Sequence, residues 1–191
     1  KIRQLNRILH KVRSYKDAMR ALSDEELSHL TQVYKERLVA GETLDALLPE
    51  AYAAVCEADY RILGKFPYDV QVLGAIALHQ GYLAEMNTGE GKTLVATMPL
   101  YLNALTGKST ILLTTNEYLV LRDAEEMGQV YRFMGLTISA GVGEKPEERF
   151  SNAEKKVVYS ADIVYTTHAV LGFDFLLNNL VKSAQDRFMR D

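Results

Sequence analysis

Apolar residues recur at three- and four-residue spacing over residues 2–22, and this pattern predicts a helix with one apolar face. Ser23 is followed by three acidic residues, the last of which is Glu26, so we expect a capping box to start a second helix. The predicted helices of the first 64 residues are 2–22, 24–40 and 49–63. Gly41 ends the second helix, Pro49 begins the third, and Gly64 ends the third. This part of the chain is therefore predicted to be helical.

From residue 66 onward, short runs rich in β-branched and apolar residues alternate with longer helical patterns. The runs predicted as strands are residues 82–86, 109–115, 136–142 and 161–167, and the predicted helices are 68–81, 93–105, 117–135 and 171–181. Residues 144–156 form a polar stretch before the last of these strands. Strands that alternate with long helices imply parallel strands joined by crossovers, so the predicted class is an α/β fold.

Composition narrows the class of protein. Of the 191 residues, 48% are apolar and 25% are charged, as in an ordinary globular protein. Cys56 is the single cysteine, which excludes an internal disulfide. No apolar stretch approaches the ~20 residues of a membrane span. Because no cationic and then apolar leader stands at the amino end, we expect the protein in the reducing cytosol.

The net charge of −3 hides a basic amino-terminal end. Within the first 20 residues a single acid, Asp17, accompanies the basic residues Lys1, Arg3, Arg7, Lys11, Arg13, Lys16 and Arg20. Two interpretations stay open: a packing helix whose charged face is solvated, or a segment that contacts an anionic partner such as lipid. The remainder of the chain is acidic, which argues against a nucleic-acid binder.

The sequence TGEGKT, at residues 88–93, carries the clearest chemistry. Gly89, Gly91, Lys92 and Thr93 match the end of a phosphate-binding loop, Gly-x-x-x-x-Gly-Lys-Ser/Thr, between an apolar run and a helix. Glycines let backbone N–H groups approach phosphate oxygens, and the helix adds the positive end of its dipole. Lys92 would contact the β- and γ-phosphates of ATP, and the Thr93 hydroxyl would hold Mg²⁺.

The residues around the loop leave an alternative open. Met86 stands where the general pattern begins with glycine, and a plain strand-to-helix turn with a solvated Lys92 would also fit. Gln71 precedes the loop by a helix and a strand, and its amide can both donate to and accept from the edge of adenine. Its position before the loop is the only reason to consider Gln71 a nucleotide ligand.

Three stretches resemble SecA, the ATPase motor that drives unfolded preproteins through the bacterial Sec channel and whose core is related to the superfamily-two helicases. They are YDVQVLGAIALHQGYLAEMNTGEGKTLVATMPLYLNALTGK, TTNEYLVLRDAEEM and ADIVYTTHAVLGFDFLLNN. The family has methionine at the first loop position, as at Met86. The resemblance covers about residues 66–179. It implies a RecA-like, parallel-sheet P-loop domain whose first part is 65–191, after a helical segment at 1–64.

The resemblance implies roles for individual residues. The nucleotide ligands would be Tyr68, Gln71, Gly89, Glu90, Gly91, Lys92 and Thr93, with Lys92 and Thr93 catalytic and Thr93 on Mg²⁺. Residues 114–124 are similar to the helicase motif that couples nucleotide state to movement. The implied partners are preproteins, a SecY-type channel with accessory Sec proteins, and an anionic membrane surface, with no nucleic acid. The implied location is the cytoplasm and the periphery of the cell membrane, and a homodimer of the full-length protein is left open.

The chain also departs from the pattern of a housekeeping SecA. That pattern has Gly-Thr-Asn-Asn-Glu where this chain has TTHAV at residues 166–170, and it has arginine and aspartate at the positions of Leu177 and Asn178. These positions lie away from the phosphate loop. We interpret them as the mark of an accessory SecA, the specialised second copy of some Gram-positive bacteria, which exports a few substrates such as serine-rich glycoprotein adhesins.

A helicase-type ATPase also needs an Asp-Glu pair after a later strand and an arginine from a second domain. No apolar strand ending in Asp-Glu occurs before Asp191. We therefore expect an amino-terminal fragment that holds ATP but hydrolyses it at background rate on its own. Two other functions stay open, namely a nucleic-acid helicase or remodeller built on the same core, and a non-catalytic docking module.

Overall fold

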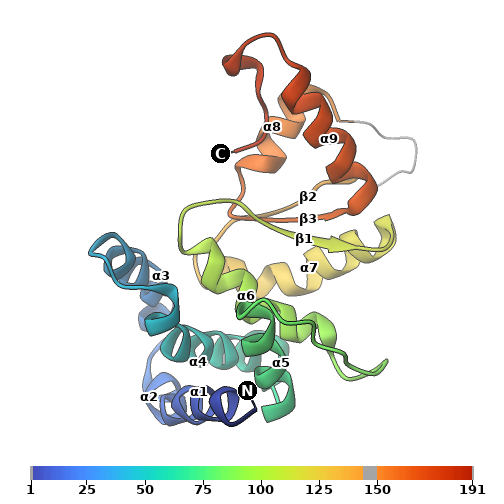
Figure 1. Cartoon of the computed structure of the whole chain (residues 1–191). Helices are drawn as coiled ribbons and strands as arrows, with labels where there is room; N and C mark the ends of the chain where they lie inside the picture. Colours follow the sequence, from blue (N-terminus) through green and yellow to red (C-terminus); the bar gives the residue numbers. More distant parts are fainter. Residues whose placement is uncertain (1, 144–149, 191) are drawn as a thin grey trace.

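The computed structural model describes residues 2–143 and 150–190, with helices at one end and a small sheet towards the other (Figure 1). The amino-terminal elements are α1 (Ile2–Ser14), α2 (Lys16–Ala21), α3 (Asp24–Val39), α4 (Leu44–Leu63) and α5 (Asp69–His79). They are followed by α6 (Lys92–Ala104), β1 (Thr110–Thr114), α7 (Glu117–Phe133), β2 (Ile138–Ala140), α8 (Asn152–Ser160), β3 (Ile163–Thr167), α9 (His168–Leu180) and the 3-10 turn η1 (Ala184–Asp186). The predicted α/β fold preceded by helices is confirmed.

Within the described residues, the strands form one parallel sheet of order β1-β3-β2. Ile163 of β3 lies opposite Thr110 of β1 on one side and opposite Ile138 of β2 on the other. Every residue of β3 is buried, as expected for a central strand covered on both faces. α6 and α7 lie on one side of the sheet, and α8 and α9 lie on the other (Figure 1). The predicted parallel strands with helical crossovers are therefore confirmed.

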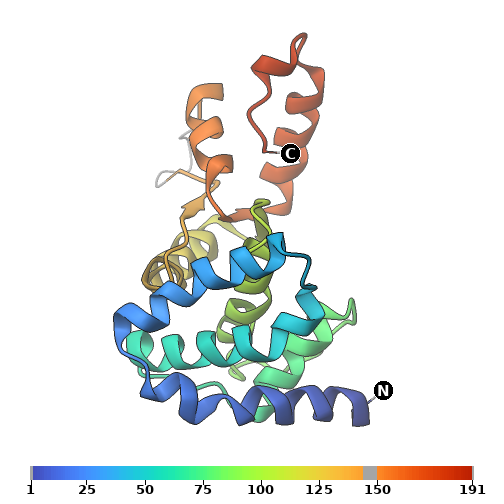
Figure 2. The same cartoon turned by 90° about the vertical axis from the view of Figure 1, so that its left-hand side faces the viewer.

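The start of α3 follows the predicted capping box. The Glu26 N–H donates to Ser23 Oγ at 3.1 Å, and the Ser23 N–H donates to the Glu26 carboxylate at 2.7 Å. These bonds lower the pKa of the Glu26 carboxyl. The single helix predicted over 2–22 is wrong, because the chain breaks at Tyr15 into α1 and α2. Figure 2 shows α1 along the base of the molecule, next to α4.

The start of α4 differs from the prediction. Proline favours the first turn of a helix, so Pro49 indicated a start there. The helix instead begins at Leu44, and Thr43 caps it by accepting the Ala46 N–H at 3.2 Å. Pro49 lies near the start of α4 and removes only the hydrogen bond to the Asp45 carbonyl. The helix tolerates that loss because its buried face packs along α1, α3 and α6.

One apolar core joins the amino-terminal helices to the sheet. Its fully buried side chains include Leu27, Tyr34, Tyr52, Ile76, Met98, Tyr101, Tyr131 and Tyr165. α4 lies at the centre of this core, because it packs against α6 and α7 as well as α1, α2 and α3. The domain boundary at residue 64 stays a prediction. No helix of the described ranges is both long and apolar enough to cross a membrane.

Residues 82–86, predicted as a strand, form no strand in the structure. Leu83 is 95% exposed, and no strand of the described part of the chain pairs with this run. A strand needs a neighbour to satisfy its backbone N–H and C=O groups. Apolar composition alone was therefore an insufficient signal here.

The sequence pattern assigned no helix or strand to the polar stretch 144–156, but the structure places the start of α8 in its second half. Ser151 Oγ accepts the Glu154 N–H at 3.3 Å, and the Glu154 carboxylate accepts the Ser151 N–H at 2.7 Å. This capping box, Ser-x-x-Glu, was the signal that could have revealed the helix. Residues 144–149 lie outside the described residues.

Candidate functional site

The glycine-rich loop ends at the N-terminus of α6, where Gly91 occupies the N-cap position. Gly89 and Gly91 have φ values of +88° and +75°, in the left-handed region that favours glycine. No described side chain caps α6, so the N–H groups of its first turn, beginning with Lys92 and Thr93, stay available for an anion. The loop therefore has the backbone geometry expected of a phosphate-binding loop.

Met86 does not interrupt this loop. In the described ranges no residue other than glycine has a positive φ, so the backbone at Met86 does not require glycine. Its side chain packs against the apolar core, and a Cβ placed on Gly74 of α5 would lie 3.5 Å from Met86 Sδ. The methionine thus anchors the start of the loop to α5.

Gln71 links the start of α5 to the loop. Its side chain is 6% exposed, its Oε1 accepts the Tyr68 N–H at 2.7 Å, and its Nε2 donates to the Glu90 carbonyl at 3.0 Å. A Cβ placed on Gly91 would lie 2.4 Å from Gln71 Nε2. Gly91 is therefore required both by its φ and by the close approach of Gln71.

Glu90 stabilises the loop from within. Its carboxylate accepts hydrogen bonds from the backbone N–H and the side-chain amide of Asn87, at 2.7 and 3.0 Å. Glu90 is exposed, and its contribution to a nucleotide would come from its backbone, since a carboxylate repels phosphate. These bonds keep the turn between Asn87 and Gly91 closed.

A pocket of about 480 Å³ opens beside the loop. Its lining residues are Gly64, Lys65, Phe66, Tyr68, Gln71, Gly89, Gly91, Thr93, Leu94, Glu126 and Met127. This volume lies within the ~300–1,000 Å³ of small-molecule sites. The pocket lies between the linker after α4, the start of α5, the loop and one turn of α7. Its size and its position fit a nucleotide whose phosphates lie on the loop.

The structure brings most of the predicted ligands to this pocket. Tyr68, 75% exposed, stands at its rim, and Thr93 is partly buried in its wall. Lys92 is exposed at the first position of α6 and Glu90 is exposed in the loop, and neither side chain lines the pocket. The roles of these residues with ATP and Mg²⁺ stay predictions.

Sequence reasoning missed one pair of pocket residues. Lys65 Nζ lies 2.7 Å from the Glu126 carboxylate of α7, and the two side chains are 57% and 40% exposed. This ion pair connects the linker after α4 to α7. No local pattern marks it, because the two residues are separated by 61 positions.

The other two stretches that resembled SecA lie at the end of the sheet. After β1, Asn116 Oδ1 accepts the Leu119 N–H at 2.9 Å and caps α7. After β3, Thr167 Oγ1 accepts the Val170 N–H at 3.3 Å and caps α9. Asn178, where the housekeeping pattern has aspartate, accepts the Phe188 and Met189 N–H groups at 2.8 and 3.0 Å. Asn178 thus holds the chain that follows α9.

Comparison with known proteins agrees with this geometry. The family model described as "SecA DEAD-like domain" matches residues 1–191. Relatives named "Protein translocase subunit SecA 2" are 60% identical in Streptococcus sanguinis (strain SK36), 56% in Streptococcus gordonii and 49% in Staphylococcus aureus (strain Newman). The alignments cover 98%, 100% and 99% of this chain and 24% of each relative, so the chain spans about a quarter of their length. The shared name confirms the resemblance to an accessory SecA, and the chain belongs to the SecA family through its SecA DEAD-like domain.

Proposed function

We propose that this chain is the ATP-binding part of a SecA-type motor, which couples ATP hydrolysis to the export of unfolded preproteins through the Sec channel. The observation that carries the proposal is the contact between Gln71 and the glycine-rich loop. An amide able to bind a base lies 3.0 Å from the backbone of a loop able to hold phosphate. A nucleotide presents these two groups at its two ends. Membership of the SecA family supports adenine as the base.

In this proposal the triphosphate lies against the N–H groups of residues 89–93 and the positive end of the α6 dipole. Lys92 is exposed, so its ammonium group can turn towards the β- and γ-phosphates. The Thr93 hydroxyl holds Mg²⁺, which neutralises phosphate charge when it is bound. Lys92 and Thr93 are the two catalytic residues within this chain.

The base would lie on the other side of the pocket. Tyr68 is exposed at the rim, so its ring can lie against adenine. The Gln71 amide would exchange its bond to the Glu90 carbonyl for bonds to the base edge. Nucleotide binding would therefore loosen the contact between α5 and the loop. The contact between α5 and the loop would therefore differ between the empty and the nucleotide-bound pocket.

Hydrolysis needs a carboxylate that orients the attacking water. We propose that this group is an Asp-Glu pair on a further strand that pairs with residues 82–86, where Leu83 is exposed and without a strand partner in the described residues. ATP would then close a cleft between this domain and a second one, and reopening would move the preprotein. On its own, this chain should hydrolyse ATP at background rate.

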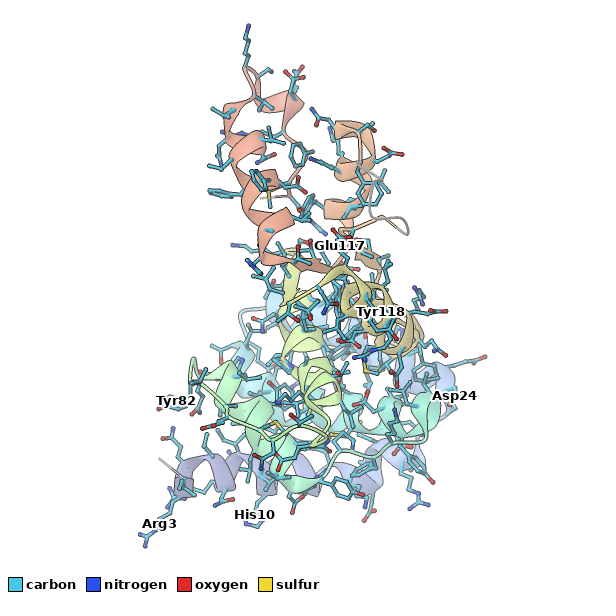
Figure 3. The ribbon with its side chains drawn as sticks, turned by 90° about the vertical axis from the view of Figure 1, so that its right-hand side faces the viewer. Arg3, His10, Asp24, Tyr82, Glu117 and Tyr118 are labelled. Atoms are coloured by element: carbon cyan, nitrogen blue, oxygen red, sulfur yellow. The ribbon has the colours of Figure 1, made fainter. Side chains whose placement is uncertain are left out.

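The amino-terminal helix offers a surface for an anionic partner. Arg3, Arg7, His10 and Lys11 of α1 are exposed, and Figure 3 shows Arg3 and His10 projecting away from the rest of the molecule. We propose that this face contacts anionic lipid or the Sec channel from the cytoplasmic side. Liposomes containing anionic lipid should bind the full-length protein less well when Arg3, Arg7 and Lys11 are changed to alanine. Unchanged binding would contradict this part of the proposal.

The substrate class follows from the accessory type of SecA. We propose that the motor serves specialised substrates such as serine-rich glycoprotein adhesins. Capture experiments with the full-length protein should enrich adhesin precursors over the general precursor pool. Recovery of the general pool without enrichment would contradict this substrate class.

The test of the main function is the ATPase of the natural full-length protein, measured with preprotein and membranes. Lys92→Ala should abolish the stimulated rate. Lys108→Ala should leave it unchanged, because Lys108 is also an exposed lysine but lies after the end of α6, away from the loop. Stimulation by RNA in place of preprotein and membranes would favour a helicase instead. Normal export with Lys92→Ala would favour a non-catalytic docking module.

A further inference from the structure

Arg13, at the end of α1, reaches the linker that leads into the pocket. Its Nε lies 2.8 Å from Asp69 Oδ1, and its second guanidinium nitrogen donates to the Pro67 carbonyl at 2.7 Å. The Arg13 side chain is 22% exposed, whereas that of Asp69 is 69% exposed. One guanidinium therefore binds the chain on both sides of Tyr68.

The linker depends on such side chains for its position. Residues 65–68 belong to neither a helix nor a strand, so no ladder of backbone hydrogen bonds holds them. The Phe66 ring lies under two cations, with its centre 5.1 Å from the Arg13 guanidinium and 4.7 Å from Lys16 Nζ. Both distances are within the ~6 Å of a cation–π contact. The helices α1 and α2 thus hold this linker from outside.

The linker in turn forms one wall of the nucleotide pocket. Phe66 and Tyr68 of the linker line the pocket together with Gly89 and Gly91 of the glycine-rich loop. The loop has its own supports, in the N-terminus of α6 and in the bonds between Asn87 and Glu90. Gln71 joins the linker to the loop, but the loop keeps these supports of its own. Loss of Arg13 should therefore displace the wall more than the phosphate loop.

We propose that Arg13 is a positioning residue of the nucleotide pocket, whose guanidinium holds Pro67 and Asp69 so that Phe66 and Tyr68 stand where the base binds. This inference rests on the proposed function, because it assigns a base to that wall. Arg13 does not touch the nucleotide and acts through the linker. It also differs from Arg3, Arg7 and Lys11, whose exposure suits them to an external partner.

The experiment compares two ligands, Mg²⁺-ATP and Mg²⁺-tripolyphosphate, by calorimetric titration of the natural full-length protein. Both ligands need the phosphate loop, and only ATP needs the base wall. Arg13→Asp places two carboxylates together and should weaken ATP binding about tenfold, with tripolyphosphate binding unchanged. The exchange Arg13→Asp with Asp69→Arg restores an ion pair and should recover ATP binding to within about threefold. Arg13→Lys keeps the charge without the two-pronged guanidinium and should give an intermediate loss.

The control is Arg20→Asp, which makes the same change of charge at an exposed position of α2, away from the linker. It should leave binding of both ligands unchanged. The inference is overturned if Arg13→Asp leaves ATP binding unchanged, weakens both ligands equally, or is not rescued by the exchange. Failure of the unaltered protein to bind ATP would instead overturn the proposed function itself. The exchange and Arg13→Lys keep the test decisive if Arg13→Asp does not fold.

Discussion

The side-chain amide of Gln71 lies 3.0 Å from the carbonyl oxygen of Glu90, and its oxygen accepts the Tyr68 N–H at 2.7 Å. A single buried side chain therefore joins the entrance of α5 to the loop in front of α6. Both hydrogen bonds are partly buried, and each contributes about 0.5–1.5 kcal/mol. This contact fixes the distance between the two sides of the pocket.

Gly91→Ala should impair the pocket more than the fold. An alanine Cβ at this position would lie 2.4 Å from Gln71 Nε2, at a φ of +75°. Gly107 has a similar φ of +78° but open space around it, so Gly107→Ala is the matched control. Both variants should lose about 1–2 kcal/mol of stability from the left-handed backbone. Only Gly91→Ala should weaken binding of a fluorescent ATP analogue, by about tenfold or more. Equal binding by the two variants would contradict the close contact.

Gln71→Glu should reduce the preference for adenine. A carboxylate can still accept the Tyr68 N–H, but it cannot donate to the Glu90 carbonyl or to a base. Competition between ATP and GTP should show that the discrimination falls about tenfold. Gln80→Glu, at the other end of α5, serves as the control and should keep the discrimination. Unchanged discrimination in Gln71→Glu would remove Gln71 from the base site.

The fully buried Asp59 should make the stability depend on pH. It lies in α4, and its Oδ2 is 3.0 Å from Thr97 Oγ1 of α6. Burial raises the pKa of the Asp59 carboxyl well above its usual range, and the Thr97 bond opposes this only in part. The titratable groups around it are Cys56 of α4, Tyr131 of α7 and Tyr165 of β3. The pKa of each is raised, first by burial and further by the Asp59 carboxylate among other groups.

Because the folded state holds the Asp59 proton more tightly, its contribution to stability is full below the unfolded pKa of about 3.9. It is lost as the pH rises towards the folded pKa, at up to about 1.4 kcal/mol per pH unit. Asp59→Asn carries no proton to lose, so its unfolding free energy should lack this fall. Denaturant unfolding at a series of pH values measures it, with the exposed Asp17→Asn as control. Parallel pH profiles of Asp59→Asn and the unaltered protein would contradict a protonated Asp59.

Asn178 should tolerate aspartate but not leucine. Among the described residues, Asn178 uses its Oδ1 as acceptor for the Phe188 and Met189 N–H groups, and an aspartate keeps that oxygen. The nearby Asp174 is already paired with Lys155 at 2.6 Å, which limits charge repulsion. Asn178→Leu leaves both N–H groups unpaired and should cost about 1–3 kcal/mol of unfolding free energy. Hydrogen exchange at residues 188 and 189 should accelerate in the leucine variant alone. Similar exchange in both variants would contradict this role.

The elements that the sequence predicted well are those stabilised by neighbours along the chain. The capping box of Ser23 and Glu26, the β-branched runs and the glycine-rich loop are local patterns, and each is found in the structure. The wrong predictions concern positions where contacts between distant parts of the chain decide the local structure. Residues 82–86 lack a neighbouring strand among the described residues, and Pro49 is accommodated inside α4 because that helix lies at the centre of the core.

The sequence by itself determined that a glycine-rich loop with the pattern of a phosphate-binding loop stands before a helix, and that the motif belongs with SecA. It could do so because φ preferences, capping and motif spacing act over a few residues. Only the tertiary structure decided that the Gln71 side chain packs against Gly91, and that Arg13 binds Pro67 and Asp69 on either side of Tyr68. The latter contact joins positions 56 residues apart, and such contacts depend on how the core packs rather than on any pattern along the chain.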